Sequence, residues 1–168
     1  MKAILIAPDH AKRTTTVSTV EVAEDDIGDA SLESLYSILQ CQEIEVVDCD
    51  PTGALQGHCA IVDENGLTAD NPGYTWCPQI GLQPLAGRIL LMRTNSDGFM
   101  VEAQVSEASV RSLPGLAYLI PSMAARFAHR FEEQVINAYP GAILVKASDF
   151  IDEQIARAVS KGQTNSHL

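Results

Sequence analysis

The sequence lacks the long apolar segments that a membrane protein or a secreted precursor would show. No apolar run in its 168 residues approaches the roughly 20 residues that a membrane span needs. The N-terminus, MKAILIAPDH, has one Lys and a short apolar run that Pro8 ends, without the longer apolar region and small-residue cleavage site of a signal peptide. We therefore expect no membrane association and a cytoplasmic location.

Basic residues are scarce in the first half of the chain. Residues 1–84 carry 3 Lys and Arg against 14 Asp and Glu, whereas residues 85–168 carry 8 of each, so the first half accounts for the whole net charge of −11. Direct nucleic-acid binding needs clustered Lys and Arg, and this distribution argues against it. Three interpretations remain open: an acidic face for a basic partner, a DNA mimic whose carboxylates imitate phosphates, and plain solubility.

The sequence also lacks the motifs that usually carry catalysis or metal binding. None of the four Cys belongs to a C-x-x-C pair, and no G-x-S-x-G, H-E-x-x-H or P-loop motif occurs. A zinc site from Cys49, His58, Cys59 and Cys77 is arithmetically available, but zinc sites usually contain close ligand pairs. We therefore expect buried thiols, with no metal and no cofactor. A small enzyme that uses Cys77 or His58 stays as an alternative, although neighbouring strand residues such as His58 and Cys59 point to opposite faces.

What the sequence does contain is a series of β-branched strands and amphipathic helices. These patterns predict an α+β fold, in which helices pack on a mostly antiparallel sheet. Strands are expected over residues 2–7, 14–23, 44–49, 58–63, 88–94 and 99–105. Helices are expected over 32–41, with Ser31 as its N-cap, and over 106–113, with Ser106 as its N-cap.

The last third of the chain predicts a helix–strand–helix extension, with helices over 122–138 and 149–161 and a strand over 142–147. The apolar residues of these two helices recur on one face, which we expect to be buried: Met123, Phe127, Phe131 and Val135 in the first, and Ile151, Ile155 and Val159 in the second. The predicted organisation is a core domain over 1–115 with a long loop over 65–87, an extension over 116–162 packed on it, and a disordered tail over 163–168.

The segment DNPGYTWCPQIGLQPLAGR, residues 70–88, holds the only Trp and shows neither helical nor strand periodicity. In a type II turn that starts at Asn71, Pro72 would preset φ at the second position and Gly73 would take positive φ at the third. Long loops within compact domains are usually functional or ordered by their own packing. We expect either a self-packed loop or a rigid pocket wall, in which Asn71, Gly73, Tyr74 and Trp76 contact a ligand.

Two arginines of the extension are candidates for binding an anion. Arg126 and Arg130 lie at i and i+4 near the start of the predicted helix, with His129 beside them. They are expected either to pair with the acidic first half or to hold a phosphate, a nucleotide or a partner carboxylate. Arg88 could contribute to the same site.

Four short motifs occur in a fixed order before the predicted 88–105 hairpin: IEVV (44–47), DENG (63–66), NPGY (71–74) and PLAG (84–87). In these motifs the chain, over about residues 1–115, resembles a family of uncharacterised proteins that phages, plasmids and mobile-element-rich bacterial genomes carry. The family has no established activity, so the resemblance implies a setting and not a reaction. Small accessory proteins in that setting often counter host defence.

These observations predict a non-enzymatic accessory binding protein of a phage or plasmid. It would bind a host protein or sequester a small anionic ligand, with the 70–88 segment and the arginines as the site. The alternatives are the acidic DNA mimic, which would inhibit a host DNA-binding protein, and the small enzyme. An exposed loop Trp and an apolar helix face would also suit a homodimer, without demanding one.

Overall fold

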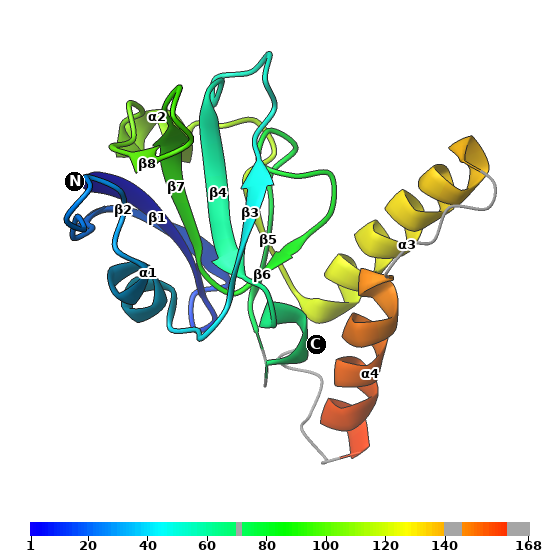
Figure 1. The fold of residues 1–168 in the computed structure, drawn as a ribbon. Coiled ribbons are helices and arrows are strands. Elements are labelled where there is room, and N and C mark those ends of the chain that lie inside the picture. The colour runs from blue at the N-terminus through cyan, green and yellow to red at the C-terminus, as the bar shows by residue number, and fades with distance from the viewer. Residues whose placement is uncertain (70–71, 140–145, 161–168) are drawn as a thin grey trace.

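Two antiparallel sheets and four α-helices form the fold of the computed structural model, which describes residues 1–69, 72–139 and 146–160 (Figure 1). The larger sheet has the strand order β2-β1-β7-β4-β3, and β8 pairs with β7. All described strand pairs are antiparallel, which confirms the predicted α+β class. The strands of this sheet are β1 (Lys2–Asp9), β2 (Thr14–Glu21), β3 (Ile44–Asp48), β4 (His58–Asp63), β7 (Ile89–Thr94) and β8 (Met100–Val101).

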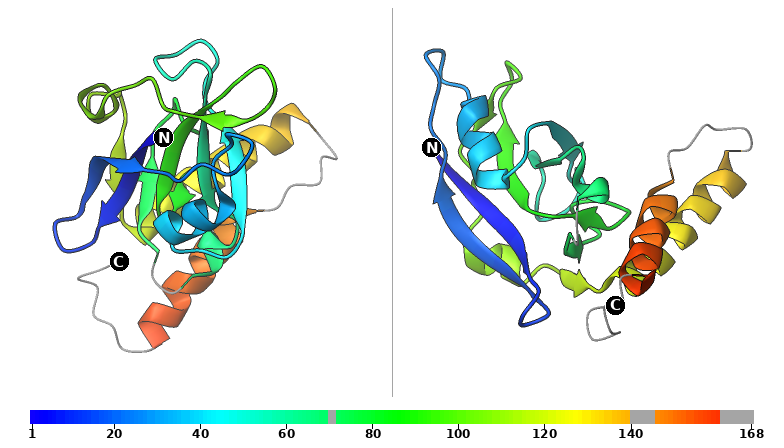
Figure 2. Two further views of the ribbon diagram at one scale, coloured as in Figure 1. Left: turned by 60° about the vertical axis from the view of Figure 1, so that its left-hand side comes forward. Right: turned by 90° about the horizontal axis from the view of Figure 1, so that it is seen from below.

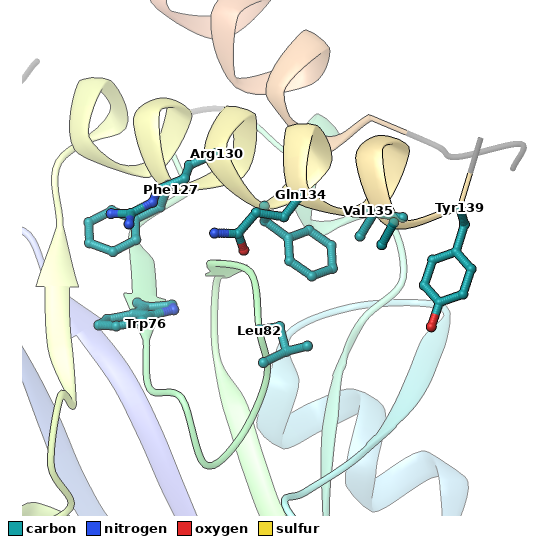
Figure 3. Close-up of a pocket in the computed structure, with 9 residues that line it drawn as sticks. Trp76, Leu82, Phe127, Arg130, Gln134, Val135 and Tyr139 are labelled. Atoms are coloured by element: carbon teal, nitrogen blue, oxygen red, sulfur yellow. The ribbon is translucent and has the colours of Figure 1, made fainter. Parts of the chain in front are cut away.

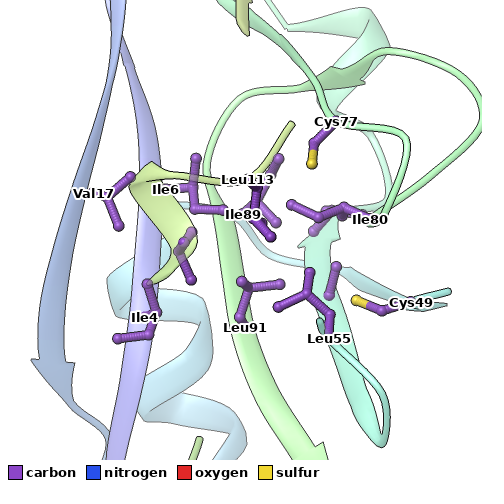
Figure 4. Close-up of a cluster of buried hydrophobic side chains, with 13 residues drawn as sticks. Ile4, Ile6, Val17, Cys49, Leu55, Cys77, Ile80, Ile89, Leu91 and Leu113 are labelled. Atoms are coloured by element: carbon purple, nitrogen blue, oxygen red, sulfur yellow. The ribbon is translucent and has the colours of Figure 1, made fainter. Parts of the chain in front are cut away.

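Both faces of the larger sheet are buried, because its side chains alternate between two apolar clusters. On β1, Ala3 packs in the cluster that α1 (Leu32–Leu39) covers, whereas Ile4 and Ile6 pack in the cluster on the opposite face. Figure 4 shows this second cluster, to which loop residues such as Leu55 and Ile80 contribute. The central strands β4 and β7 face both clusters, which explains why their sequences are apolar almost throughout.

The first two helices begin where their caps predict, but only one cap is made by a side chain. Ser31 precedes α1 without a capping hydrogen bond, and Gln40, in the left-handed conformation at φ 61°, ends this helix. Ser106 precedes α2 (Glu107–Arg111), and its Oγ accepts the Ser109 N–H at 3.1 Å. Of the strand predicted over 99–105, only β8 is present. After β8 the chain leaves β7, and the Ala103 N–H donates to the Lys2 carbonyl at 2.9 Å.

The segment predicted as one long loop over 65–87 contains regular structure. It holds the short helix η1 (Gly66–Thr68) and the strands β5 (Tyr74–Trp76) and β6 (Leu85–Ala86), and β9 (Ala117–Leu119) joins them in a second sheet of order β6-β5-β9. The predicted type II turn is wrong, since Gly73 does not have a positive φ. A Cβ at Gly73 would lie 2.2 Å from the Pro8 Cβ, so the close approach of two segments requires glycine there.

A helical hairpin stands beside the two sheets (Figure 2). It consists of α3 (Pro121–Ala138) and α4 (Ala147–Ser160), so both predicted helices are present. Most of the strand predicted over 142–147 lies outside the described residues, as does the tail over 163–168, but Ala147 begins α4 and is not part of a strand. None of the described helices is long and apolar enough to cross a membrane.

The buried face of α3 differs from the predicted one. Small side chains, Ala124, Ala125 and Ala128, are buried in a cluster with Tyr74 of β5 and with α4. Met123, by contrast, is 44% exposed. The prediction placed the largest apolar side chains inward, whereas close packing of α3 on its neighbours requires small ones. On α4 the prediction holds for Ile151, which is buried, and fails for Val159, which is 58% exposed.

Candidate functional site

An open groove of about 450 Å³ lies between α3 and the segment that follows β5 (Figure 3). We call it the α3 groove. One wall is the aromatic side of α3, and the opposite wall is formed by Trp76 and Leu82. The α3 side is lined by Phe127, Arg130, Phe131, Gln134, Val135, Ala138 and the C-cap residue Tyr139. Three residues of the predicted apolar stripe, Phe127, Phe131 and Val135, therefore line a groove, and of these Phe127 also packs against a buried cluster.

The lining of the α3 groove is aromatic and partly open to solvent. The rings of Trp76 and Phe127 lie 4.7 Å apart between centroids at an angle of 40°, which fixes the helix against β5. Leu82 is 71% exposed and Tyr139 is 69% exposed, although both are large and apolar. Contiguous exposed apolar surface of this kind is typical of a place that a ligand or partner covers.

Among the described residues of the lining, Arg130 is the one that carries a charge. Arg126, one turn earlier on α3, is also exposed but does not line the groove. Neither arginine forms an ion pair with another described residue, so the expected pairing with the acidic first half is not found there. Arg130 is thus available to an anionic group that enters beside the aromatic wall.

Of the predicted ligand-binding residues, the structure brings Trp76 and Arg130 together. Arg88 is engaged elsewhere: its guanidinium donates to the Ile38 carbonyl of α1 at 2.8 Å. Gly73 packs against Pro8, and Asn71 lies outside the described residues.

Tyr74 has a structural position instead of a place in the groove. Its side chain is fully buried, and its hydroxyl donates to Gln154 Oε1 of α4 at 2.6 Å. Burial raises the pKa of this phenol well above its ordinary value, because the apolar surroundings disfavour the phenolate. Tyr74 therefore links the smaller sheet to the helical hairpin as a neutral hydrogen-bond donor.

Seven described residues of the groove were not among the predicted site residues: Leu82, Phe127, Phe131, Gln134, Val135, Ala138 and Tyr139. The spacing of Phe131 with Phe127 was visible in the sequence, but a helical apolar stripe does not reveal whether it faces a core or a groove. Leu82 carries no sequence signal, since it is one apolar residue between polar and small ones.

Cys77 and His58, the candidates for the alternative enzyme, are held in buried positions. Burial raises the pKa of the Cys77 thiol, which disfavours the thiolate that nucleophilic catalysis or zinc binding needs. Both ring nitrogens of His58 are engaged, Nδ1 at 3.2 Å from the Gln56 carbonyl and Nε2 at 3.2 Å from the Gln104 N–H.

The residues of the conceivable zinc site are divided between the two faces of the sheet. Cys49 and Cys77 belong to one buried cluster, and Cys59 belongs to the other. Within residues 1–69, 72–139 and 146–160, no group of three or more metal-binding side chains occurs.

Comparison with protein families identifies the first two thirds of the chain. Residues 1–110 match the model of a family described as a domain of unknown function, DUF3846. The chain belongs to the DUF3846 family. No curated protein and no solved structure matches it. The DUF3846 match includes both sheets except β9, and it includes Trp76 and Leu82 of the groove, whereas α3 lies beyond it.

Proposed function

We propose that this DUF3846 protein is a non-enzymatic binding protein that holds its partner in the α3 groove. The observation that carries the proposal is the combination of a partly exposed aromatic lining with Arg130, which is the one basic residue in the described lining and forms no ion pair with another described residue. Ligand sites typically join a mostly apolar surface to a few polar groups that fix orientation. The groove meets this description, and it needs no reactive side chain.

The lining indicates what the bound group must offer. An apolar or aromatic moiety would cover Trp76, Phe131 and Leu82, and a carboxylate or phosphate would reach Arg130. A segment of a host protein with an acidic residue beside an apolar one meets this description, and so does a small anionic ligand with a hydrophobic part. The host protein and the small ligand would be recognised by the same apolar and anionic groups, and their masses distinguish them.

The biological setting is part of the proposal. The resemblance to proteins of phages and plasmids supports an accessory role in a bacterial cytoplasm. In that setting a host protein is the favoured partner, and interference with a host defence system is the favoured outcome. The separate possibility of a homodimer is decided by the same measurement.

The experiment is native mass spectrometry on tagged protein purified gently from a cell that naturally carries the gene. The test variant is Arg130→Glu, and the matched control is Arg126→Glu, which reverses an exposed arginine one turn away on α3 outside the groove. We expect wild type and Arg126→Glu to retain a bound mass that Arg130→Glu loses. The loss should be at least about tenfold in occupancy, since the variant replaces an attractive charge by a repulsive one.

The bound mass identifies the source of the ligand. A macromolecular mass indicates a host protein, twice the chain mass indicates a homodimer, and a mass of a few hundred daltons released on denaturation indicates a small ligand. Equal occupancy in both arginine variants would place binding outside the groove. Apo protein in all samples would contradict the proposal for that cell.

A further inference from the structure

The two edge strands of the larger sheet, β2 and β3, differ in whether their outward backbone groups have hydrogen-bond partners. At the β2 edge, side chains of α2 satisfy two of the outward backbone groups: the Thr19 N–H donates to Glu107 Oε1 at 2.7 Å, and Arg111 donates to the Val17 carbonyl. Such covering hinders an edge strand from pairing with another chain. The middle of the β2 edge is therefore covered by the protein itself.

The β3 edge has no such cover in the described structure. The Cys49 N–H donates to the His58 carbonyl and the Glu64 N–H donates to the Glu43 carbonyl, so the odd-numbered residues of β3 face β4. Antiparallel pairing alternates, which turns the N–H and C=O groups of Ile44, Val46 and Asp48 away from the sheet. None of these outward groups has a hydrogen-bond partner among the described residues.

A second hollow, of about 570 Å³, lies beside this edge, and we call it the acidic hollow. Its apolar surface comes from Val47, Ile80, Leu82, Leu85 and Phe131 together with prolines. The charged residues among its described lining are all acidic, namely Glu45, Asp48 and Asp50. The acidic hollow adjoins the α3 groove, and both are lined by Leu82 and Phe131. The charged residues that line the hollow are acidic, whereas the charged residue that lines the groove, Arg130, is basic.

A strand added to β3 would use both features at once. Its backbone would pair with Ile44, Val46 and Asp48, and its alternate side chains would point to opposite faces of the extended sheet. One set would enter the acidic hollow, which suits an apolar side chain flanked by Lys or Arg. The other set would lie beside Val46, which is 46% exposed.

The charges decide between a second copy of the chain and a different partner. Antiparallel pairing of two β3 strands would gather the carboxylates of Glu45, Asp48 and Asp50 of both copies at one junction, and juxtaposed like charges are unfavourable at an interface. A basic strand meets the same carboxylates with complementary charge. We propose that β3 accepts, as an added strand, an extended peptide of a partner protein that places both basic and apolar side chains on the face that enters the hollow. This surface is additional to the α3 groove.

The probe is a panel of six-residue peptides in which one face carries an apolar residue flanked by Lys or Arg and the other face carries Thr and Val, with acetyl-Lys-Thr-Leu-Val-Lys-Thr-amide as the parent. Binding to the full chain is measured by titration calorimetry at low salt. The matched peptide control has Glu in place of Lys. Two further peptides carry N-methyl groups on alternate amides, one on the odd and one on the even residues, so that only one of them loses the donors that face β3.

The protein variants separate backbone pairing from charge. Val46→Pro removes an N–H that points away from β4, so an edge strand tolerates it while an added strand loses a partner. Glu45→Lys and Asp48→Lys reverse the charge of the hollow, and Glu102→Lys reverses an exposed carboxylate outside it as the control. Far-ultraviolet circular dichroism and Trp76 emission establish that each variant is folded.

We expect the basic panel to bind, with affinity that falls as salt rises. The two charge reversals in the hollow and one of the two N-methylated peptides should weaken binding at least about tenfold, and Glu102→Lys less than about twofold. Binding that neither Val46→Pro nor either N-methylated peptide weakens would be nonspecific charge attraction and would overturn the proposal. So would dissociation constants above about 1 mM for the whole panel. Arg130→Glu should leave peptide binding intact, so failure here is distinguishable from failure of the α3 groove.

Discussion

Glu132 should be the residue on which the helical hairpin depends most. It is 4% exposed on α3, and its carboxylate accepts two hydrogen bonds from Ser148, one from the N–H at 2.8 Å and one from Oγ at 2.5 Å. Ser148 is fully buried and is the second residue of α4, where backbone N–H groups have no partner within the helix. Glu132 thus caps α4 from the neighbouring helix, and the positive end of α4 compensates its buried charge.

The size of the expected destabilisation follows from the hydrogen-bonding groups that a substitution of Glu132 would leave without a partner. In Glu132→Ala, the N–H and the Oγ of Ser148 lose their acceptor in a buried place, and each unsatisfied group costs about 1–3 kcal/mol. Loss of the favourable charge at the start of α4 adds about 0.3–1 kcal/mol. These contributions sum to about 2–7 kcal/mol, and we expect a loss towards the lower end, about 3 kcal/mol, for Glu132→Ala. Glu132→Gln keeps one acceptor oxygen, so roughly half that loss is expected.

The assay is urea unfolding followed by Trp76 fluorescence, because Trp76 stacks on Phe127 of α3 and reports whether the helix is docked. With a slope of about 1–3 kcal/mol per molar urea, 3 kcal/mol lowers the midpoint by roughly 1–3 M. The matched control is Glu133→Ala, the exposed neighbour on the same helix, for which a change within about 0.5 kcal/mol is expected. Equal midpoints for Glu132→Ala and Glu133→Ala would refute the capping role.

Two further predictions concern packing and ionisation. Gly73→Ala should destabilise the protein by about 1–3 kcal/mol or more, because its Cβ would lie 2.2 Å from Pro8, whereas Gly81→Ala, with its nearest atom at 3.7 Å, should be nearly neutral in the same urea assay. Burial raises the pKa of the Cys49 thiol to about 12, whereas the same thiol in the unfolded chain ionises near 9.0. Between these two pH values the unfolded state therefore binds fewer protons than the folded state. The free energy of unfolding should consequently fall as the pH rises from 9 towards 12. Cys49→Ala should flatten this fall by up to about 1.4 kcal/mol per pH unit in unfolding curves measured across that range, and an unchanged slope would contradict the assignment.

The strands of the larger sheet were predictable because their signal is local. Alternation and β-branched residues mark β1 and β2, and the apolar runs of β4 and β7 fit strands that are buried on both faces. The short strands β5 and β6 carry no such signal, since two or three residues cannot show a period. They exist because β9, far along the chain, completes their sheet.

The orientation of α3 could not be predicted, because two faces of the helix compete for burial. The stripe that contains Phe127 and Phe131 is the more hydrophobic one, and burial energy alone would place it inward. The neighbouring stripe of alanines allows α4 and β5 to approach, and Glu132, which caps α4, fits at its end. Steric fit decided the orientation and left the aromatic residues to line a groove. The candidate site was likewise only partly predictable. Trp76 was identified because it is the only Trp in the sequence, whereas nothing in the sequence singled out Leu82.

The boundary of the family match separates the two proposed surfaces. The β3 edge and all but one residue of the acidic hollow lie within residues 1–110, and the exception is Phe131. The α3 groove instead needs both parts, because the DUF3846 domain supplies Trp76 and Leu82 and the extension supplies the aromatic side of α3 with Arg130. Binding at β3 therefore requires little beyond the domain itself, whereas binding in the groove requires that α3 be docked. It follows that Glu132→Ala, which loosens the hairpin, should weaken occupancy of the groove and leave binding of the basic peptides at β3 largely unchanged.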